Sequence, residues 1–175
     1  MEPLWGTEIF PEYYSRFEKA ARETEGVTLT WEGHFIDPLF THTTTGFTRP
    51  GDEEHPYLAS VSCVHDPEEE GFVQEIIIQP EEAAKRVSAI PAGDGSFRTI
   101  PPEAFPEQVQ IISRDEAGYA LQLQIGGFPF NGEEVRLALG LPSACFELNR
   151  HGSDVRFTVR GRGHGWGLSQ TEAQA

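Results

Sequence analysis

The sequence is poor in cysteine and in positive charge, and it has no long apolar run. Only Cys63 and Cys145 occur among 175 residues, too few for a disulfide framework. Thirteen basic against 28 acidic residues give a formal charge of −15, which opposes binding to nucleic acid. No stretch of eighteen apolar residues and no signal-like N-terminus is present, so we predict neither a transmembrane segment nor a signal within this chain. If the native protein is exported, its signal or anchor is expected upstream.

The length and patterning predict one α+β domain over residues 1–175, built mostly of antiparallel strands and hairpins with about three short helices. An apolar fraction of 38% is enough for a single core. The segment 89–106 is rich in proline, glycine and serine, and it is the place where two lobes could divide.

Three helices are expected from apolar periodicity and capping signals. The first begins at Pro11 and ends before Gly26, and its aromatic stripe is typical of a core face. The second covers residues 80–87, and the third follows an Asn131 cap and ends at Gly140. Alternation predicts strands and hairpins in the following segments: 27–31 with 34–36, 41–48, 57–63, 72–79, 109–114 with 119–125, and 145–148 with 155–159.

A glycine-rich stretch near the C-terminus, residues 159–170, stands out from this pattern. Glycines recur at every second position from Gly161 to Gly167, with an arginine, a histidine and a tryptophan between them and a serine and a glutamine after them. Such a set can hold a polar, ring-shaped ligand. The alternative is a glycine-rich turn with one hydrogen-bonded histidine. The stretch matches neither a dinucleotide-binding motif nor a Walker loop.

Several motifs together resemble stage II sporulation protein D and its amidase-enhancer relatives. The stretch Gly161-Arg-Gly-His-Gly-Trp-Gly-Leu-Ser-Gln170 is similar to the family signature G-x-G-H-G-V-G-M-S-Q, and the helical segment from Asn131 to Ser143 precedes it as in the family. Thr43 to Thr48 resembles the family's S-T-S-x-G-x-T, and Pro56 to Val61 its P-Y-L-x-S-V. The likeness covers nearly the whole chain.

This resemblance implies a sporulation protein that remodels peptidoglycan during engulfment, as a lytic transglycosylase acting on glycan strands stripped of their peptides. In the family a glutamate on an upstream helix is the general acid, and nothing in this sequence matches its motif. The chain is therefore expected to correspond to the C-terminal portion of the family, incomplete at its N-terminus, and we assign it no catalytic residue. The family is extracytoplasmic and membrane-associated.

The residues predicted to bind glycan supply hydroxyl, amide, guanidinium and ring groups rather than an acid. An aromatic ring can stack on a sugar face, and the polar groups can bond its hydroxyls and acetamido groups. For Arg136 a structural salt bridge is the competing interpretation, and for the threonines an ordinary place in a sheet. The candidate substrate-binding residues are Thr43, Thr44, Thr45, Arg136, His164, Trp166, Ser169 and Gln170.

Two alternatives remain open. One is a non-enzymatic module that binds glycan or activates a cell-wall amidase, which would then be its partner. The other is a zinc site, since some family members bind zinc; the candidate ligands here are His42, His55, Cys63 and His65, although their spacing is irregular and no C-x-x-C occurs. Otherwise no cofactor is expected.

Overall fold

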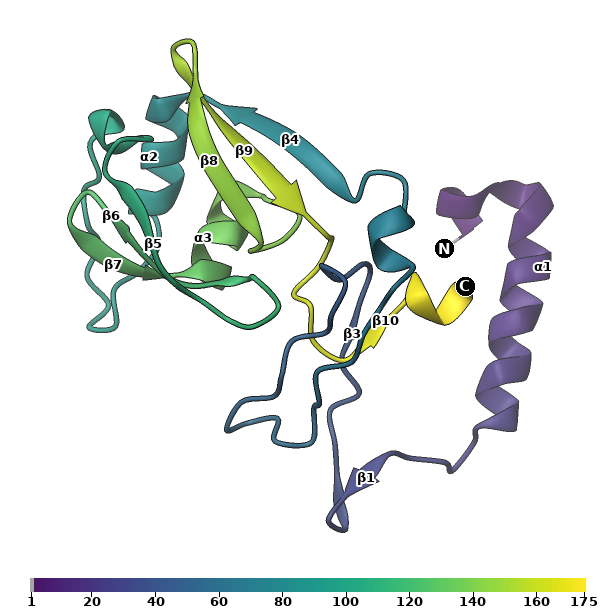
Figure 1. The fold of residues 1–175 in the computed structure, drawn as a ribbon. Helices are drawn as coiled ribbons and strands as arrows, with labels where there is room; N and C mark the ends of the chain where they lie inside the picture. The colour runs from purple at the N-terminus through teal and green to yellow at the C-terminus, as the bar shows by residue number, and fades with distance from the viewer. Residues whose placement is uncertain (1) are drawn as a thin grey trace. The chain divides into compact units, whose positions relative to one another are not determined.

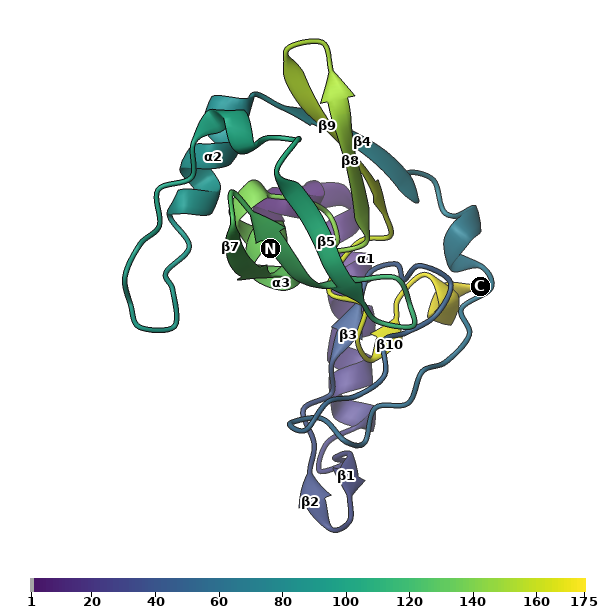
Figure 2. The same cartoon turned by 60° about the vertical axis from the view of Figure 1, so that its left-hand side comes forward.

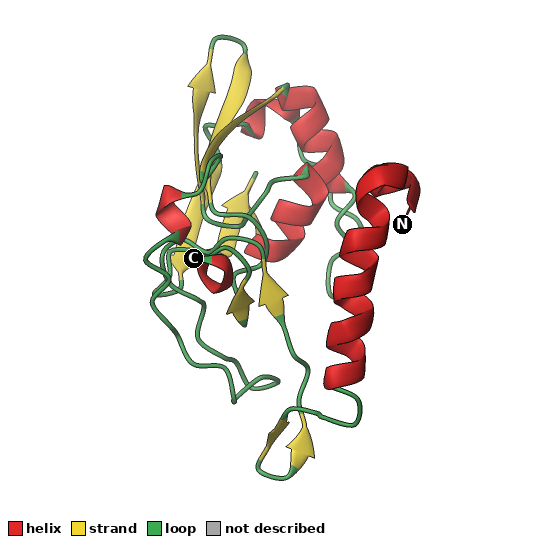
Figure 3. Ribbon diagram, turned by 90° about the vertical axis from the view of Figure 1, so that its right-hand side faces the viewer, coloured by secondary structure: helices red, strands yellow, loops and turns green. Residues whose placement is uncertain are grey.

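The structure is a computed structural model that describes the backbone of residues 2–175 and the side chains of residues 10–175. The chain forms two units, one ending at Ile36 and the other running from Asp37 to Ala175. Figure 3 shows their helices, strands and loops by colour. In the described residues there are three α-helices and ten strands in small, mostly antiparallel sheets, so the predicted α+β class is confirmed.

The N-terminal unit contains one long helix and one short hairpin. Helix α1 spans Glu2–Glu23, and strands β1 (Thr30–Trp31) and β2 (His34–Phe35) pair antiparallel. The hairpin turn has positive φ at both central positions, 49° at Glu32 and 82° at Gly33. This is the turn geometry that fits the right-handed twist of two antiparallel strands, and the predicted hairpin is confirmed.

Two predictions about the first helix are wrong. The helix begins at Glu2, so Pro11 lies inside it instead of at its start. The prediction relied on the preference of proline for the first turn of a helix. A helix can also contain a proline in its interior, at the loss of one backbone hydrogen bond. The aromatic stripe is also no core face, because Tyr13, Tyr14 and Phe17 are all exposed. A unit of this length has too few residues to enclose a core around them.

The second unit is built on two three-stranded antiparallel sheets and a short parallel pair (Figure 1). One sheet has the order β4-β9-β8, the other the order β5-β6-β7, and β3 pairs with β10. The strands are β3 (Phe40–Thr41), β4 (Val73–Ile78), β5 (Val109–Arg114), β6 (Ala120–Ile125), β7 (Phe128–Asn131), β8 (Phe146–His151), β9 (Asp154–Arg160) and β10 (Leu168–Ser169).

Helices α2 (Pro80–Ser88) and α3 (Gly132–Leu139) complete the core of this unit. They contact each other, and α3 also contacts β6 and β7. Both predicted helices are confirmed: the Asn131 side chain accepts a hydrogen bond from the Glu133 amide, and Gly140 ends α3 in the left-handed conformation. The largest buried apolar side chains here include Leu123, Ile125, Leu139, Phe146, Val155, Phe157 and Val159.

The predicted strand over 57–63 is replaced by a loop, and of the β-branched segment 41–48 only Thr41 belongs to a strand, β3. From the first segment only Ser62 forms an isolated bridge, to Phe47, while Thr43 pairs with Arg162. Both segments satisfy their backbone groups through turns and side-chain hydroxyls, so no continuous ladder is required. The hairpins over 109–125 and 145–159 are confirmed. These loops bring the threonine segment beside the glycine-rich stretch.

Candidate functional site

The glycine-rich stretch and the threonine segment are held together by main-chain hydrogen bonds. Arg162 and Thr43 exchange two such bonds, with N···O distances of 2.8 and 3.0 Å, and the Gln170 amide donates to the Thr41 carbonyl at 2.9 Å. Strand β10 lies parallel to β3, and Figure 1 shows the yellow C-terminal segment beside it. Two segments more than 120 residues apart in sequence therefore form one wall.

All four glycines have a positive φ and lie close to another part of the chain, and the contacts at Gly165 and Gly167 show this most clearly. At Gly165, with φ of 84°, a β-carbon would collide with the Tyr119 ring; at Gly167, with φ of 76°, it would collide with the Leu39 carbonyl. Only glycine meets both conditions without strain. The spacing noted in the sequence is thus a packing requirement as well as a possible ligand surface.

Arg49 is the centre of this wall, although the sequence did not identify it. Its side chain is 3% exposed, and its Nε donates to Asp115 Oδ2 at 2.5 Å. Its Nη1 donates to Glu133 Oε1 and to the His164 carbonyl, each at 3.2 Å. The guanidinium also lies 3.7 Å from the centroid of the Trp166 ring. A buried cation with these partners joins four separate segments of the chain.

His164 and Trp166 are oriented by each other and by Arg49. The Trp166 amide donates to His164 Nδ1 at 3.1 Å, and the indole Nε1–H donates to the Pro50 carbonyl at 3.1 Å. Nδ1 is therefore an acceptor, as in the neutral imidazole. Burial lowers the pKa of His164, the Arg136 and Arg49 charges lower it further, and the Glu133 charge acts in the opposite sense. The imidazole is uncharged at neutral pH.

Next to this pair lies a pocket of about 340 Å³, which we call the Trp166 pocket. Its size falls in the range of small-ligand sites in proteins. Three carboxylates and an indole face it, together with main-chain and apolar groups. The lining residues are Arg49, Pro50, Gly51, Asp52, Asp115, Ala120, Leu121, Asn131, Glu133 and Trp166.

The predicted site residues fall into two groups around this wall. His164 and Trp166 lie beside Arg49, and Arg136 joins them indirectly, since its Nε donates to Glu133 Oε2 at 2.6 Å. That bond is the structural salt bridge that was the competing interpretation for Arg136. Thr45 donates its hydroxyl proton to the Ala117 carbonyl at 2.6 Å.

The second group surrounds Asp66, a carboxylate that is fully buried. Asp66 accepts hydrogen bonds from the Thr44 amide at 2.5 Å and from the Ser169 hydroxyl at 2.8 Å. Thr43 is also buried, and its hydroxyl bonds to Thr171 Oγ1 at 2.9 Å. In this conformation these groups hold the two segments together. Gln170 contributes its main-chain bond to the same place.

Arg49, Asp66, Asp115 and Glu133 are the residues that sequence reasoning missed. Each is charged and lies in or beside a loop, where charge is normally solvated, and no local pattern marks it as buried. The one signal available was that the arginine follows directly on the family-like threonine segment, residues 43–48.

The four candidate zinc ligands are not brought together. His42 bonds to Thr43, His55 to Asp52, and His65 to Glu172, while Cys63 is buried near the Val61 carbonyl. Burial raises the pKa of Cys63, which favours the neutral thiol over a metal-binding thiolate. Within the described residues there is no group of three or more His, Cys, Asp or Glu side chains that could hold a metal ion.

No family model matches the chain. The chain is, however, similar in sequence to two curated bacterial proteins. It is 27% identical over 170 residues to stage II sporulation protein D of Bacillus amyloliquefaciens, covering 95% of the chain and 46% of that protein. It is 28% identical over 177 residues to stage II sporulation protein D of Bacillus subtilis strain 168, covering 97% and 47%.

The resemblance that the motifs predict is thereby confirmed: the chain is similar to stage II sporulation protein D over nearly its whole length. It spans about half the length of the curated relatives that it matches. No helix among the described residues is both long and apolar enough to cross a membrane.

Proposed function

We propose that this chain serves in cell-wall remodelling during sporulation and that its Trp166 pocket binds glycan strands of peptidoglycan. The similarity to two stage II sporulation D proteins supports the process. The pocket supports the ligand, because an indole edged by hydrogen-bonding groups is a common arrangement for a sugar ring. The family is expected to have lytic transglycosylase activity. We propose that this chain contributes glycan binding to that reaction and that it does not cleave glycan by itself.

The binding role rests on the hydrogen bonds that the three carboxylates of the pocket make within the protein. Glycan cleavage needs a carboxylic acid that is protonated at the scissile oxygen. Both oxygens of Glu133 accept from arginines, Arg49 and Arg136. Asp115 accepts from Arg49 through one oxygen and from the Tyr119 amide through the other. Every oxygen of these two groups is therefore engaged in a hydrogen bond within the protein, and each keeps a second lone pair that can accept from a ligand.

Asp52, the third carboxylate, is equally unsuited to act as an acid. Burial acts to raise its pKa, but hydrogen bonds and the charge of His55, together with the Glu54 amide, outweigh burial and lower it. Its Oδ1 accepts from the His55 ring and amide. All three groups can instead accept hydrogen bonds from sugar hydroxyls. The pocket is therefore a binding surface whose acid must come from elsewhere.

Calorimetric titration with soluble, peptide-free glycan oligosaccharides tests this proposal. Saturable binding is expected, with no cleavage by this chain alone. Trp166→Phe, which keeps a ring beside Arg49 but loses the indole Nε1–H, should weaken binding about tenfold, equivalent to ~1.4 kcal/mol. Leu137→Ala, at an exposed position of α3, is the control and should not change the affinity.

The results separate the alternatives. Cleavage by the chain alone would contradict the assignment of no catalytic residue. The absence of saturable glycan binding by the folded wild-type chain would contradict the binding role. If a cell-wall amidase then bound the same preparation and gained activity, the chain would be the activating module instead.

A further inference from the structure

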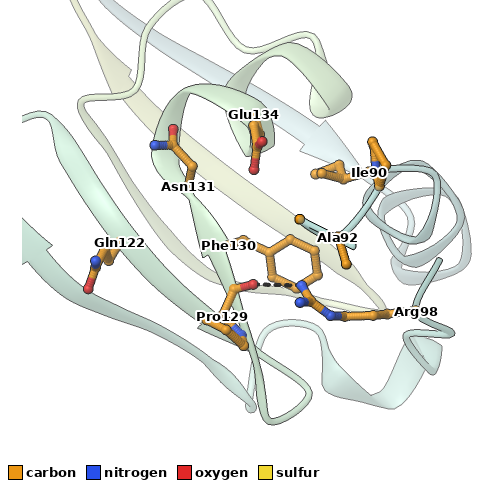
Figure 4. Close-up of a pocket in the computed structure, with 10 residues that line it drawn as sticks. Ile90, Ala92, Arg98, Gln122, Pro129, Phe130, Asn131 and Glu134 are labelled. Atoms are coloured by element: carbon orange, nitrogen blue, oxygen red, sulfur yellow. Dashed lines mark hydrogen bonds between the residues drawn. The ribbon is translucent and has the colours of Figure 1, made fainter. Parts of the chain in front are cut away.

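A second pocket, of about 290 Å³, adjoins the first, and we call it the Arg98 pocket. Figure 4 shows it in close-up, with the Arg98 guanidinium and the Glu134 carboxylate approaching from opposite sides. Asn131 lines both pockets. Glu133 lines the Trp166 pocket and the next residue, Glu134, lines the Arg98 pocket, so the first turn of α3 separates them.

Arg98 is held in place without being fully used. Its Nη1 donates to the Pro129 carbonyl at 2.9 Å, and its guanidinium lies 5.6 Å and 5.4 Å from the centroids of the Phe128 and Phe130 rings. The charge of Arg98 also acts on Asp94, whose pKa it helps to lower after the hydrogen bonds of Ser96, but among residues with described side chains no carboxylate lies within salt-bridge distance of Arg98. Guanidinium has five N–H donors, so most of them remain available at the pocket.

An oriented guanidinium with free donors matches the two oxygens of a carboxylate, which it can bind through two parallel hydrogen bonds. Peptidoglycan offers one such group at each muramic acid, on the lactyl side chain. In a strand that carries peptides this carboxyl is tied up in an amide and has no charge. Removal of the peptide frees it, so the carboxylate distinguishes a stripped strand from an intact one.

The position of Arg98 suits a strand that also occupies the Trp166 pocket. Pro129, which holds Arg98, and Asn131, which lines both pockets, are two residues apart on β7, or about 7 Å of strand. The chain as a whole carries a formal charge of −15 and repels polyanions, so it cannot attract a stripped strand by its overall field. A single oriented cation gives a local and selective contact instead.

We infer that the Arg98 pocket is a subsite that recognises the free lactyl carboxylate of peptide-stripped glycan, with Asn131 available to the neighbouring hydroxyl and acetamido groups. The inference rests on the proposed function, because it assigns the substrate selectivity of the same glycan-binding surface. It makes Arg98 a specificity-determining residue.

The test compares two oligosaccharides of equal length by calorimetry at low ionic strength. One is peptide-free glycan with its lactyl carboxylates, and the other is made of N-acetylglucosamine alone and lacks them. The wild-type chain should bind the first about tenfold more tightly, because the carboxylate adds a charge-assisted pair of hydrogen bonds to the guanidinium. Arg98→Gln should abolish this preference and leave the affinity for the second oligosaccharide unchanged.

Two further variants control for folding and for charge. Arg98→Lys keeps the charge but loses the planar fork, so it should retain part of the preference. Glu134→Gln removes a negative charge from the same pocket and should bind the carboxylate-bearing oligosaccharide as tightly as the wild type or more so. Each variant is first compared with the wild type by thermal unfolding.

The failure of this inference can be told from failure of the proposed function. If the wild-type chain binds neither oligosaccharide, the glycan-binding function is contradicted and the subsite falls with it. If both bind through Trp166, but Arg98→Gln changes both affinities equally or neither of them, only the carboxylate subsite is overturned. Equal wild-type affinities for the two oligosaccharides would overturn it as well.

Discussion

Two arginines, each beside an aromatic ring and a pocket, have opposite roles in this protein. Arg49 is buried, and it bonds two carboxylates and one carbonyl and stacks on Trp166. Arg98 is half-buried and bonds one carbonyl. Arg49 bonds to three other segments and holds the protein together, whereas Arg98 is oriented by two rings, bonds a single carbonyl and keeps donors available to a ligand. Figure 2 gives a second view of the helices and strands of the chain.

Replacing the two arginines by methionine should separate these roles most strongly. Arg49→Met leaves Asp115 and Glu133 without their shared cation, and removing one partner of a buried ion pair costs about 3–5 kcal/mol. Arg98→Met loses one hydrogen bond at a half-buried site and should cost about 1 kcal/mol. Urea denaturation of both variants measures the free energies of unfolding. Equal losses would contradict the contrast.

Replacing one glycine near each pocket by alanine should give the next largest difference in stability. Gly165→Ala places a β-carbon against the Tyr119 ring at a φ of 84°, so overpacking and backbone strain together should cost about 3 kcal/mol. Gly93 lines the Arg98 pocket, has no positive φ and has open space around it. Gly93→Ala should therefore leave the melting temperature nearly unchanged. Thermal unfolding of the pair is the measurement, and a small effect at Gly165 would show that the wall can relax.

Removing the hydroxyl of Ser169 should have an intermediate effect. It donates to both oxygens of the buried Asp66, and a hydrogen bond to a charged group is worth about 1.5–3 kcal/mol. Ser169→Ala should destabilise the chain by about 2 kcal/mol, measured by urea denaturation. Ser153→Ala is the matched control, because that hydroxyl is exposed and bonds only weakly to Asp154. A neutral Ser169 variant would mean that Asp66 does not depend on this bond.

The smallest predicted effect is a pH dependence from His164. Burial lowers its pKa in the folded protein, so the unfolded chain binds its proton more readily. The stability that the neutral ring contributes is present above an unfolded pKa of about 6.5 and is lost as the pH falls below it. In His164→Asn, which keeps a side-chain acceptor for the Trp166 amide, this contribution should disappear. Urea denaturation from pH 5 to 8 compares the two slopes, and equal slopes would contradict the prediction.

The regular elements of the fold were largely predictable, because each carries its own local signal. Asn131 and Gly140 mark both ends of α3, and alternation marks the hairpin of β8 and β9. The failures lie where a periodic pattern is present in the sequence but the fold provides no partner for it. The segment 57–63 alternates like a strand but has no long partner strand, and the aromatic stripe of α1 has no surface within its own unit to cover it.

The site was predictable only in part. The glycine spacing and the histidine and tryptophan between the glycines pointed to the segment that lies beside Arg49 and the Trp166 pocket, since positive φ and close approach are visible as residue types. Arg49 and Asp66 were not predictable, because a buried charge is stable only through partners that lie far away in sequence, such as Glu133 and Ser169.

The sequence of the glycine-rich stretch by itself therefore determines its backbone conformation and its similarity to the sporulation D proteins. Which of its neighbours face a ligand is decided by tertiary structure alone. Thr44 and Ser169 are drawn inward by Asp66, and Trp166 is fixed at a pocket by Arg49. The physical reason is that backbone conformation is a local property of residue type, whereas the burial and pairing of polar groups depend on contacts across the whole fold.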